Sequence, residues 1–185
     1  RDTRQFEQVK ARLSGLPKAP TTEQATKSAR NTRGTSGPSE SIPTGRVEPP
    51  SSRYETYSEG DVFRISVPEN WRELQSESSV TFAPEGAYGQ YNNSNVFTHG
   101  VEVGVARNEA HDLQTATDEL LESLVEANPR LRRQANYRRA SVAGRSGLMT
   151  MLSNVSDATG APESIQIFTT QLRNGNLMYL IAVAP

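Results

Sequence analysis

The sequence predicts an α+β domain in which a predominantly antiparallel β-sheet carries at least one long helix. Four segments of β-type sequence, separated by turn residues, occupy residues 137–184. A strongly amphipathic helical segment precedes them, over residues 112–128. Upstream of that helix, short alternating segments end at prolines. These three observations together favour an antiparallel sheet that carries at least one long helix.

Residues 1–16 are predicted to form a short amphipathic helix, the tail of an upstream region. Asp2 or Thr3 can cap its first turn, and Gly15 followed by Pro17 ends it. Its apolar stripe consists of Phe6, Val9, Leu13 and Leu16. Because a helix of about three turns is marginal in isolation, we expect this stripe to dock against another part of the protein.

Residues 17–52 are predicted to be a linker rich in Pro, Ser and Thr. Six of the eleven prolines fall in this range, and its only large aliphatic residues are Ile42 and Val47. A flexible chain of this length would span about 30–35 Å. The alternative is a recognition segment that folds on a partner, but the two aliphatic residues offer it little anchorage.

Residues 53–185 are enough for one domain with its own core. Apolar alternation predicts strands at 62–68 and 80–82, and Trp71 between them is expected to pack at the edge of the core. The alternation over residues 97–105 predicts a strand with one face in water.

The helix after these strands has both of its end signals. Asp112 can cap it, and Asn128 followed by Pro129 ends it. The expected buried stripe is Leu113, Ala116, Leu120, Leu121, Leu124 and Val125.

The C-terminal strands are expected to form an antiparallel meander. Asn174-Gly175 predicts a type I′ hairpin between the last two strands, since both central residues of that turn need positive φ. The predicted strands cover 137–142, 147–154, 164–172 and 177–184.

Composition excludes several classes of function. The net charge of −1 argues against a strongly basic nucleic-acid binder, and the absence of cysteine excludes disulfides and thiol nucleophiles. No apolar run approaches the roughly 18 residues of a membrane span, so a soluble chain is expected.

His99 and His111, the only histidines, lack any zinc-site spacing. We therefore expect no catalytic residue, no metal ligand and no cofactor in this sequence.

Two regions are candidates for binding. Residues 85–95 predict an exposed loop, and the segment 83–96 carries aromatic and amide groups suited to ligand or protein contacts, namely Tyr88, Tyr91, Asn92 and Asn93. A plain hairpin connection is the alternative.

The second region is an arginine run comprising Arg130, Arg132, Arg133, Arg138 and Arg139. It is either an anion-binding patch or a solvated strand face paired with acids of the preceding helix.

Three segments carry a resemblance to a known family. They are 57–71, with Phe63, Val67-Pro68 and Trp71 in a Phe-x-x-x-Val-Pro-x-x-Trp pattern, then 115–129, and then 174–185, which ends in Val-Ala-Pro. Together they resemble the C-terminal domain of bacterial zinc metalloproteases of the M48 family. Residues 3–17 are similar to the segment that joins the protease part to that domain.

The resemblance implies a PsbP/Mog1-like fold, an antiparallel sheet sandwiched by helices, and a place in the bacterial cell envelope, periplasmic or secreted. The catalytic HExxH helix of the family and its distal glutamate have no counterpart here, so no zinc ligand or general base carries over to any residue. In the family a further helix follows the Val-Ala-Pro strand, so a strip of apolar sheet is expected to be covered by another element.

Three hypotheses follow. The first is a non-catalytic accessory domain that recruits or regulates through protein contacts, with the upstream protease domain or its substrate as partner. The second is a free-standing PsbP-like binding or assembly protein without a protease. The third is an enzyme that uses carboxylates in a cleft of the sheet, which would need a concave pocket with two buried acids.

Overall fold

The computed structural model describes residues 46–91, 94–110 and 112–185. The predicted helix over 1–16 and most of the predicted linker lie outside this part of the chain.

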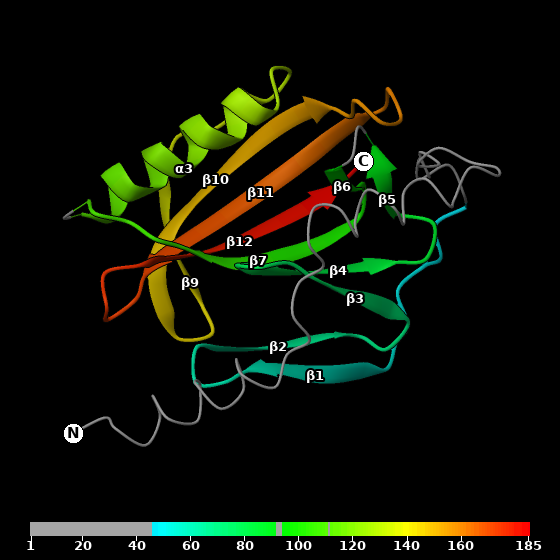
Figure 1. Ribbon diagram of the computed structural model, residues 1–185, viewed down its shortest axis with the longest axis horizontal. Coiled ribbons are helices and arrows are strands. Elements are labelled where there is room, and N and C mark those ends of the chain that lie inside the picture. The colour runs from blue at the N-terminus through cyan, green and yellow to red at the C-terminus, as the bar shows by residue number, and fades with distance from the viewer. Residues whose placement is uncertain (1–45, 92–93, 111) are drawn as a thin grey trace, which may run out of the picture. The chain divides into compact units, whose positions relative to one another are not determined.

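The described residues build one large antiparallel sheet (Figure 1). It has eight strands in the order β3-β4-β7-β12-β11-β10-β8, and β9 also pairs with β10. Its strands are β3 (Trp71–Gln75), β4 (Ser79–Pro84), β7 (Gly100–Ala106), β8 (Arg132–Arg133), β9 (Arg138–Val142), β10 (Arg145–Val155), β11 (Pro162–Gln171) and β12 (Leu177–Ala184). The last strand in sequence, β12, therefore lies between β7 and β11.

Three smaller elements complete the fold. Two are separate hairpins, β1 (Tyr54–Glu59) with β2 (Phe63–Pro68), and β5 (Tyr88–Tyr91) with β6 (Ser94–Phe97). The third is α3 (Leu113–Ala127), the one helix described. The predicted mostly antiparallel sheet with a long helix is confirmed.

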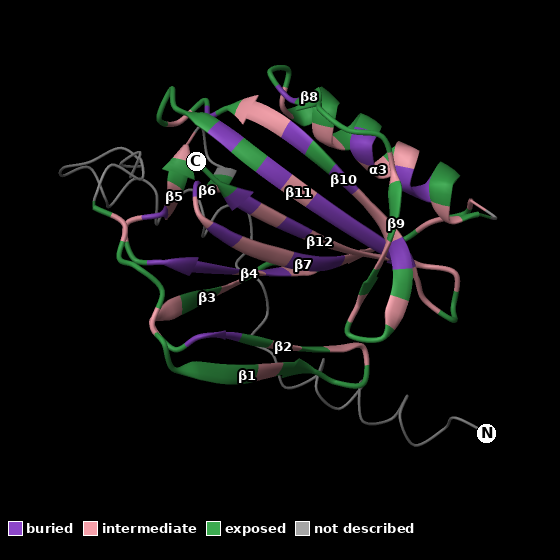
Figure 2. Cartoon of the chain, turned by 180° about the vertical axis from the view of Figure 1, so that it is seen from behind, coloured by how far each residue is buried: buried purple, intermediate pink, exposed green. Residues whose placement is uncertain are grey.

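The two faces of the sheet pack against different elements. Helix α3 covers β10, β11 and β12 on one face, where the core contains Leu121, Leu131, Leu152, Ile165, Ile167, Ile181 and Val183. The β1–β2 hairpin covers the other face, where Val67 packs with Val80, Phe82 and Val103. Figure 2 shows the resulting alternation of buried and exposed residues along the central strands. Helices on both faces were expected, and among the described residues a β-hairpin takes the second face.

Helix α3 begins and ends where its sequence signals place it. The Asp112 side chain accepts a hydrogen bond of 2.9 Å from the backbone N–H of Thr115, and Asn128 caps the other end. Two details of the stripe differ from the prediction. Val125 is 40% exposed, whereas Thr117 is buried and its hydroxyl lies 2.7 Å from that of Thr169 on β11. A threonine pair thus takes the place of an apolar contact between helix and sheet.

The region after β4 corrects the predicted loop. Residues 85–95 are mostly paired, because Tyr88–Tyr91 and Ser94–Phe97 form the β5–β6 hairpin. Phe97 belongs to this hairpin and not to β7, which begins at Gly100. The face of β7 predicted to be in water is instead half covered, since the Tyr179 hydroxyl donates to Glu102 there.

The turn between β11 and β12 is a three-residue loop and not the predicted type I′ turn. Gly175 has φ +87°, but no other residue of this turn has a positive φ. Gly175 N–H donates to Leu172 C=O, and Leu172 N–H donates to Asn176 C=O. This pattern matches a type I turn followed by a left-handed glycine, and it still pairs the strands antiparallel as predicted.

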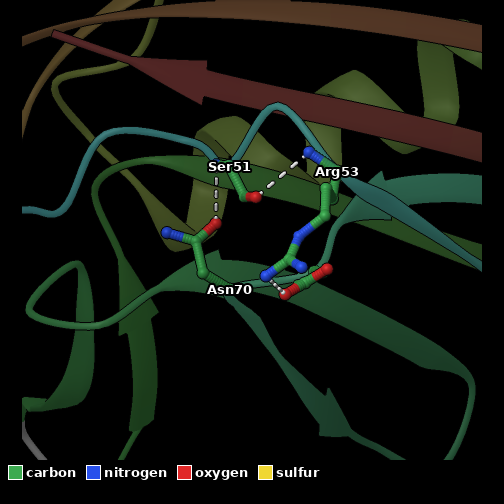
Figure 3. Close-up of polar contacts among 4 residues, drawn as sticks. Ser51, Arg53 and Asn70 are labelled. Atoms are coloured by element: carbon green, nitrogen blue, oxygen red, sulfur yellow. Dashed lines mark hydrogen bonds and ion pairs between the residues drawn. The ribbon is translucent and has the colours of Figure 1, made fainter.

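The end of the predicted linker contacts the domain (Figure 3). Ser51 N–H donates to the side chain of Asn70 at 2.8 Å, and the amide of Asn70 donates to Pro49 C=O. Arg53 forms an ion pair of 2.6 Å with Glu69. The β2–β3 turn therefore holds the chain from Pro49 onward, a few residues before the predicted start of the domain.

Strand β10 carries two apolar side chains that are exposed to solvent. On the face of β10 that points away from α3, Met151 and Val155 are 42% and 38% exposed. In the described part of the chain, no helix has the length and apolar character needed to cross a membrane.

Candidate functional site: a cavity beneath the β5–β6 hairpin

A cavity of about 370 Å³ lies on the helix-covered face of the sheet. Its walls are the C-terminal half of α3 and the β5–β6 hairpin, and its floor is the sheet. The apolar lining consists of Tyr91, Val96, Phe97, Leu124, Leu131, Ile165, Ile167, Ile181 and Val183. The β5–β6 hairpin and the C-terminal ends of α3 and β10 lie at the same end of the molecule in Figure 1. We call this space the hairpin cavity.

One end of the hairpin cavity is polar and buried. Glu163 on β11 is only 8% exposed and Ser156 only 7%. Asn154, which pairs with Glu163 in the β10–β11 register, donates from Nδ2 to Glu163 Oε2 at 3.1 Å. The Oδ1 atom of Asn154 is buried and has no hydrogen-bond partner. Buried acceptors without a donor are rare in folded proteins, so this end of the cavity has an unmet capacity to bind a donor.

Burial raises the pKa of the Glu163 carboxyl. The negative charge of Asp157 raises this pKa further, whereas hydrogen bonds from Asn154 and Ser156 partly offset the rise by stabilising the carboxylate. Glu163 is therefore easier to protonate than an exposed glutamate.

A second acid, Glu102 on β7, lines the cavity from the other side. The Tyr179 hydroxyl donates to Glu102 at 3.0 Å. Burial and the adjacent Glu102 charge raise the pKa of Tyr179 to about 12, so the phenol keeps its proton.

Glu102 and Glu163 lie on different strands of the sheet that floors the cavity. Glu102 aligns with Ile181 and, through it, with Ile167, which is four residues along β11 from Glu163. Four residue steps and two strand spacings separate their backbones by about 16 Å.

The structure places the two tyrosines of the predicted binding loop differently. Tyr91 lines the cavity. Tyr88 instead donates from its hydroxyl to Glu85 at 2.9 Å, and burial raises its pKa. Asn92 and Asn93 lie outside the described residues.

The three predicted arginines have local partners. Arg130 forms an ion pair of 3.3 Å with Asp157 at the cavity rim, and not with an acid of α3. Arg132 donates to the carbonyl oxygens of Pro129 and Leu131 at 2.7 and 2.8 Å.

Arg133 holds the segment after α3 against the helix. It donates to Ala135 C=O at 2.9 Å, and its guanidinium carbon lies 3.9 Å from the centre of the Tyr137 ring. Tyr137 in turn donates to Asp118 of α3 at 2.5 Å. Arg132 and Arg133 therefore make structural contacts around β8, and Arg130 is linked to the cavity only through its ion pair with the lining residue Asp157.

Sequence reasoning missed Glu163, Asn154 and Ser156. The alternation of side chains along the two strands could have found them. Asn154 is two residues from the buried Leu152 on β10, and Glu163 is two residues from the buried Ile165 on β11, so each lies on the inward face of its strand. A polar residue at an inward position of a strand indicates either the end of the strand or a functional site.

The described residues contain no cluster of three or more His, Asp or Glu side chains arranged to hold a metal ion. His99 lies 3.0 Å from the Thr98 hydroxyl through Nδ1, and burial lowers its pKa. His111 lies outside the described residues.

The opposite face of the sheet holds a second cavity of about 400 Å³ under the β1–β2 hairpin. Its lining includes Phe63, Ile65, Phe168 and Leu180. Arg145 closes one side, where its guanidinium donates to Val62 C=O at 2.9 Å.

No protein-family model matches the chain, and no curated protein matches it significantly.

Proposed function

We propose that this chain is a non-catalytic interaction domain that recruits or regulates through protein contacts made by the β5–β6 hairpin. The observation that carries the proposal is that the hairpin forms its own two-stranded sheet, separate from the eight-stranded one, and places Tyr91 beside a cavity. Half-buried aromatic side chains next to a concavity are typical of binding surfaces.

The parent protein that we propose is a bacterial M48-type zinc metalloprotease of the cell envelope. Support comes from the resemblance of residues 57–71, 115–129 and 174–185 to the C-terminal domain of that family. A layered antiparallel sheet is compatible with the proposed PsbP/Mog1-like fold, in which the β1–β2 hairpin would occupy part of the second layer. A tether such as the predicted linker would raise the local concentration of protease near the bound partner.

The recruitment role is tested by deleting residues 53–185 from the parent protein. Cleavage of a protein substrate should fall at least tenfold, while cleavage of a short peptide should change less than twofold, because only the protein substrate is held by tethering. Equal loss on both substrates would contradict recruitment.

A point variant sharpens this test. Tyr91→Ser at the cavity should reproduce part of the loss on the protein substrate. Tyr54→Ser is the matched control, because Tyr54 is 63% exposed and lies on the β1–β2 hairpin. Equal effects of the two substitutions would place the contact surface elsewhere.

The second candidate is a free-standing PsbP-like binding protein, which the hairpin cavity favours because a concave space of this size suits a ligand of its own. The mass and terminal sequence of the native polypeptide distinguish the two. An upstream HExxH would support the accessory domain, and a native start close to residue 1 would support the free-standing protein.

A further inference from the structure

We propose that the hairpin cavity binds a small apolar molecule that carries a protonated amine. This inference goes beyond the proposed protein contacts and does not depend on them.

The size and floor of the cavity fit the apolar part of such a ligand. Its volume of about 370 Å³ lies at the lower end of the range for small-molecule sites. Four aliphatic side chains from β11 and β12 form the floor, namely Ile165, Ile167, Ile181 and Val183. A short hydrocarbon chain or a single ring that fills this space would displace water from apolar surface.

The charge of the cavity favours a cation. Glu102, Asp157 and Glu163 line it, and none of the described lining residues is Lys, Arg or His. Of these acids, Asp157 pairs with Arg130 at the rim. Within the described ranges, Glu102 and Glu163 form no ion pair with a basic side chain. A ligand carboxylate would be repelled here, whereas an ammonium group would be attracted.

The hydrogen-bonding capacity at the buried end matches an ammonium head. The Asn154 carboxamide uses Nδ2 to bind Glu163, which leaves its buried Oδ1 without a donor. An ammonium group carries three donors and no acceptor. One N–H can bind the Glu163 carboxylate, and another can satisfy the buried Asn154 Oδ1 once the carboxamide turns toward the ligand.

The test uses three matched probes on the 185-residue chain: hexylamine, hexanol and hexanoate. Amide resonances are followed by NMR during titration at neutral pH. Hexylamine should give saturable shifts at residues 124–128, 154–163 and 181–183, and bind roughly tenfold tighter than hexanol. Hexanoate should bind more weakly than hexanol. Equal binding of all three probes, or shifts confined to the cavity under β1–β2, would overturn the proposal.

Variants then assign the head group. Glu163→Gln should remove the preference for hexylamine over hexanol, and Asn154→Leu should weaken hexylamine by roughly tenfold. Glu122→Gln is the matched control, because Glu122 is exposed on α3 and should leave all three titrations unchanged. Unchanged selectivity in folded Glu163→Gln would refute the role of the carboxylate. The probe comparison uses the unaltered chain, so it decides the outcome even if both variants misfold.

Discussion

Glu163 couples the stability of the domain to pH. Burial raises its pKa above 4.5, the value of an ordinary glutamate, so the folded state holds the proton more tightly than the unfolded state. Its contribution to stability is therefore fully present below about 4.5 and is lost as the pH rises through the raised pKa. Once ionised, the carboxylate costs free energy because it is buried.

We predict that Glu163→Gln flattens this dependence. Glutamine keeps an acceptor for Asn154 but carries no charge, so its free energy of unfolding should not show the fall as the pH rises. Urea unfolding at several values between about pH 4 and pH 8 measures the difference. Glu122→Gln should behave like the native chain. Parallel curves for native chain and Glu163→Gln would contradict the prediction.

Tyr137, the residue before β9, is linked to α3 by a hydrogen bond from its hydroxyl to Asp118. Removing it in Tyr137→Phe leaves Asp118 without its donor and should lower the free energy of unfolding by about 1–2 kcal/mol. Tyr54→Phe, whose ring is mostly exposed, should change it by less than about 0.5 kcal/mol. Chemical denaturation checks both, and an equal effect would show that the Asp118 contact contributes no net stability.

Of the individual binding residues, the sequence predicted Tyr91 of the hairpin cavity and missed Asn154, Ser156 and Glu163 at its buried polar end. The reason is that the burial of Glu163 and of the Asn154 Oδ1 atom depends on the pairing of β10 with β11, and the residue types alone do not predict it. Arg132 and Arg133 were conspicuous by charge, yet their partners are carbonyl groups and a ring, which composition does not reveal.

Among the elements, α3 and the β10–β11–β12 meander were predictable because local signals determine them. A cap at Asp112, a period of 3.6 and glycine-containing turns all act within a few residues. Strand β3 and the β5–β6 hairpin were missed. Strand β3 lies at a sheet edge and is rich in Arg, Glu and Gln, so its sequence has no clear apolar alternation. Its hydrogen-bonded pairing with β4, and not its own pattern, makes it a strand.

The contact between β10 and β11 depends on the absence of a side chain at Gly147. A Cβ atom there would lie 2.0 Å from Thr169 C=O and 2.7 Å from the Phe168 ring. Gly147→Ala should therefore destabilise the domain by about 1–3 kcal/mol.

Gly60→Asn is the control for this prediction. Gly60 has φ +48° and open space around its Cα, and asparagine tolerates that backbone region. Thermal unfolding of the two variants should differ clearly; a similar midpoint would mean that β10 and β11 move apart at little cost.

For the whole molecule, the decisive feature is strand order. Strand β12 pairs with β7 through Leu180 and Val103, and with β11 through Leu180 and Phe168. The pairing of β7 with β12 closes a long loop, which slows folding of β-rich domains to milliseconds or seconds.

We predict that a chain shortened after Gln171 does not unfold cooperatively, because both neighbours of β12 lose their partner. Adding a synthetic peptide of residues 172–185 should restore a cooperative transition by strand addition. A peptide of scrambled sequence should not. Calorimetry measures both, and a cooperative transition in the shortened chain alone would contradict the prediction.

The central position of β12 also has a consequence during protein synthesis. A ribosome that adds 5–20 residues per second needs roughly 4–14 s to proceed from the end of β7 to the start of β12. Throughout that interval the valine-rich edge of β7 has no neighbour on the side that β12 will occupy. Nascent chains on one polysome could pair with each other along that edge, so a chaperone that shields Val101 and Val103 would act in this window of translation.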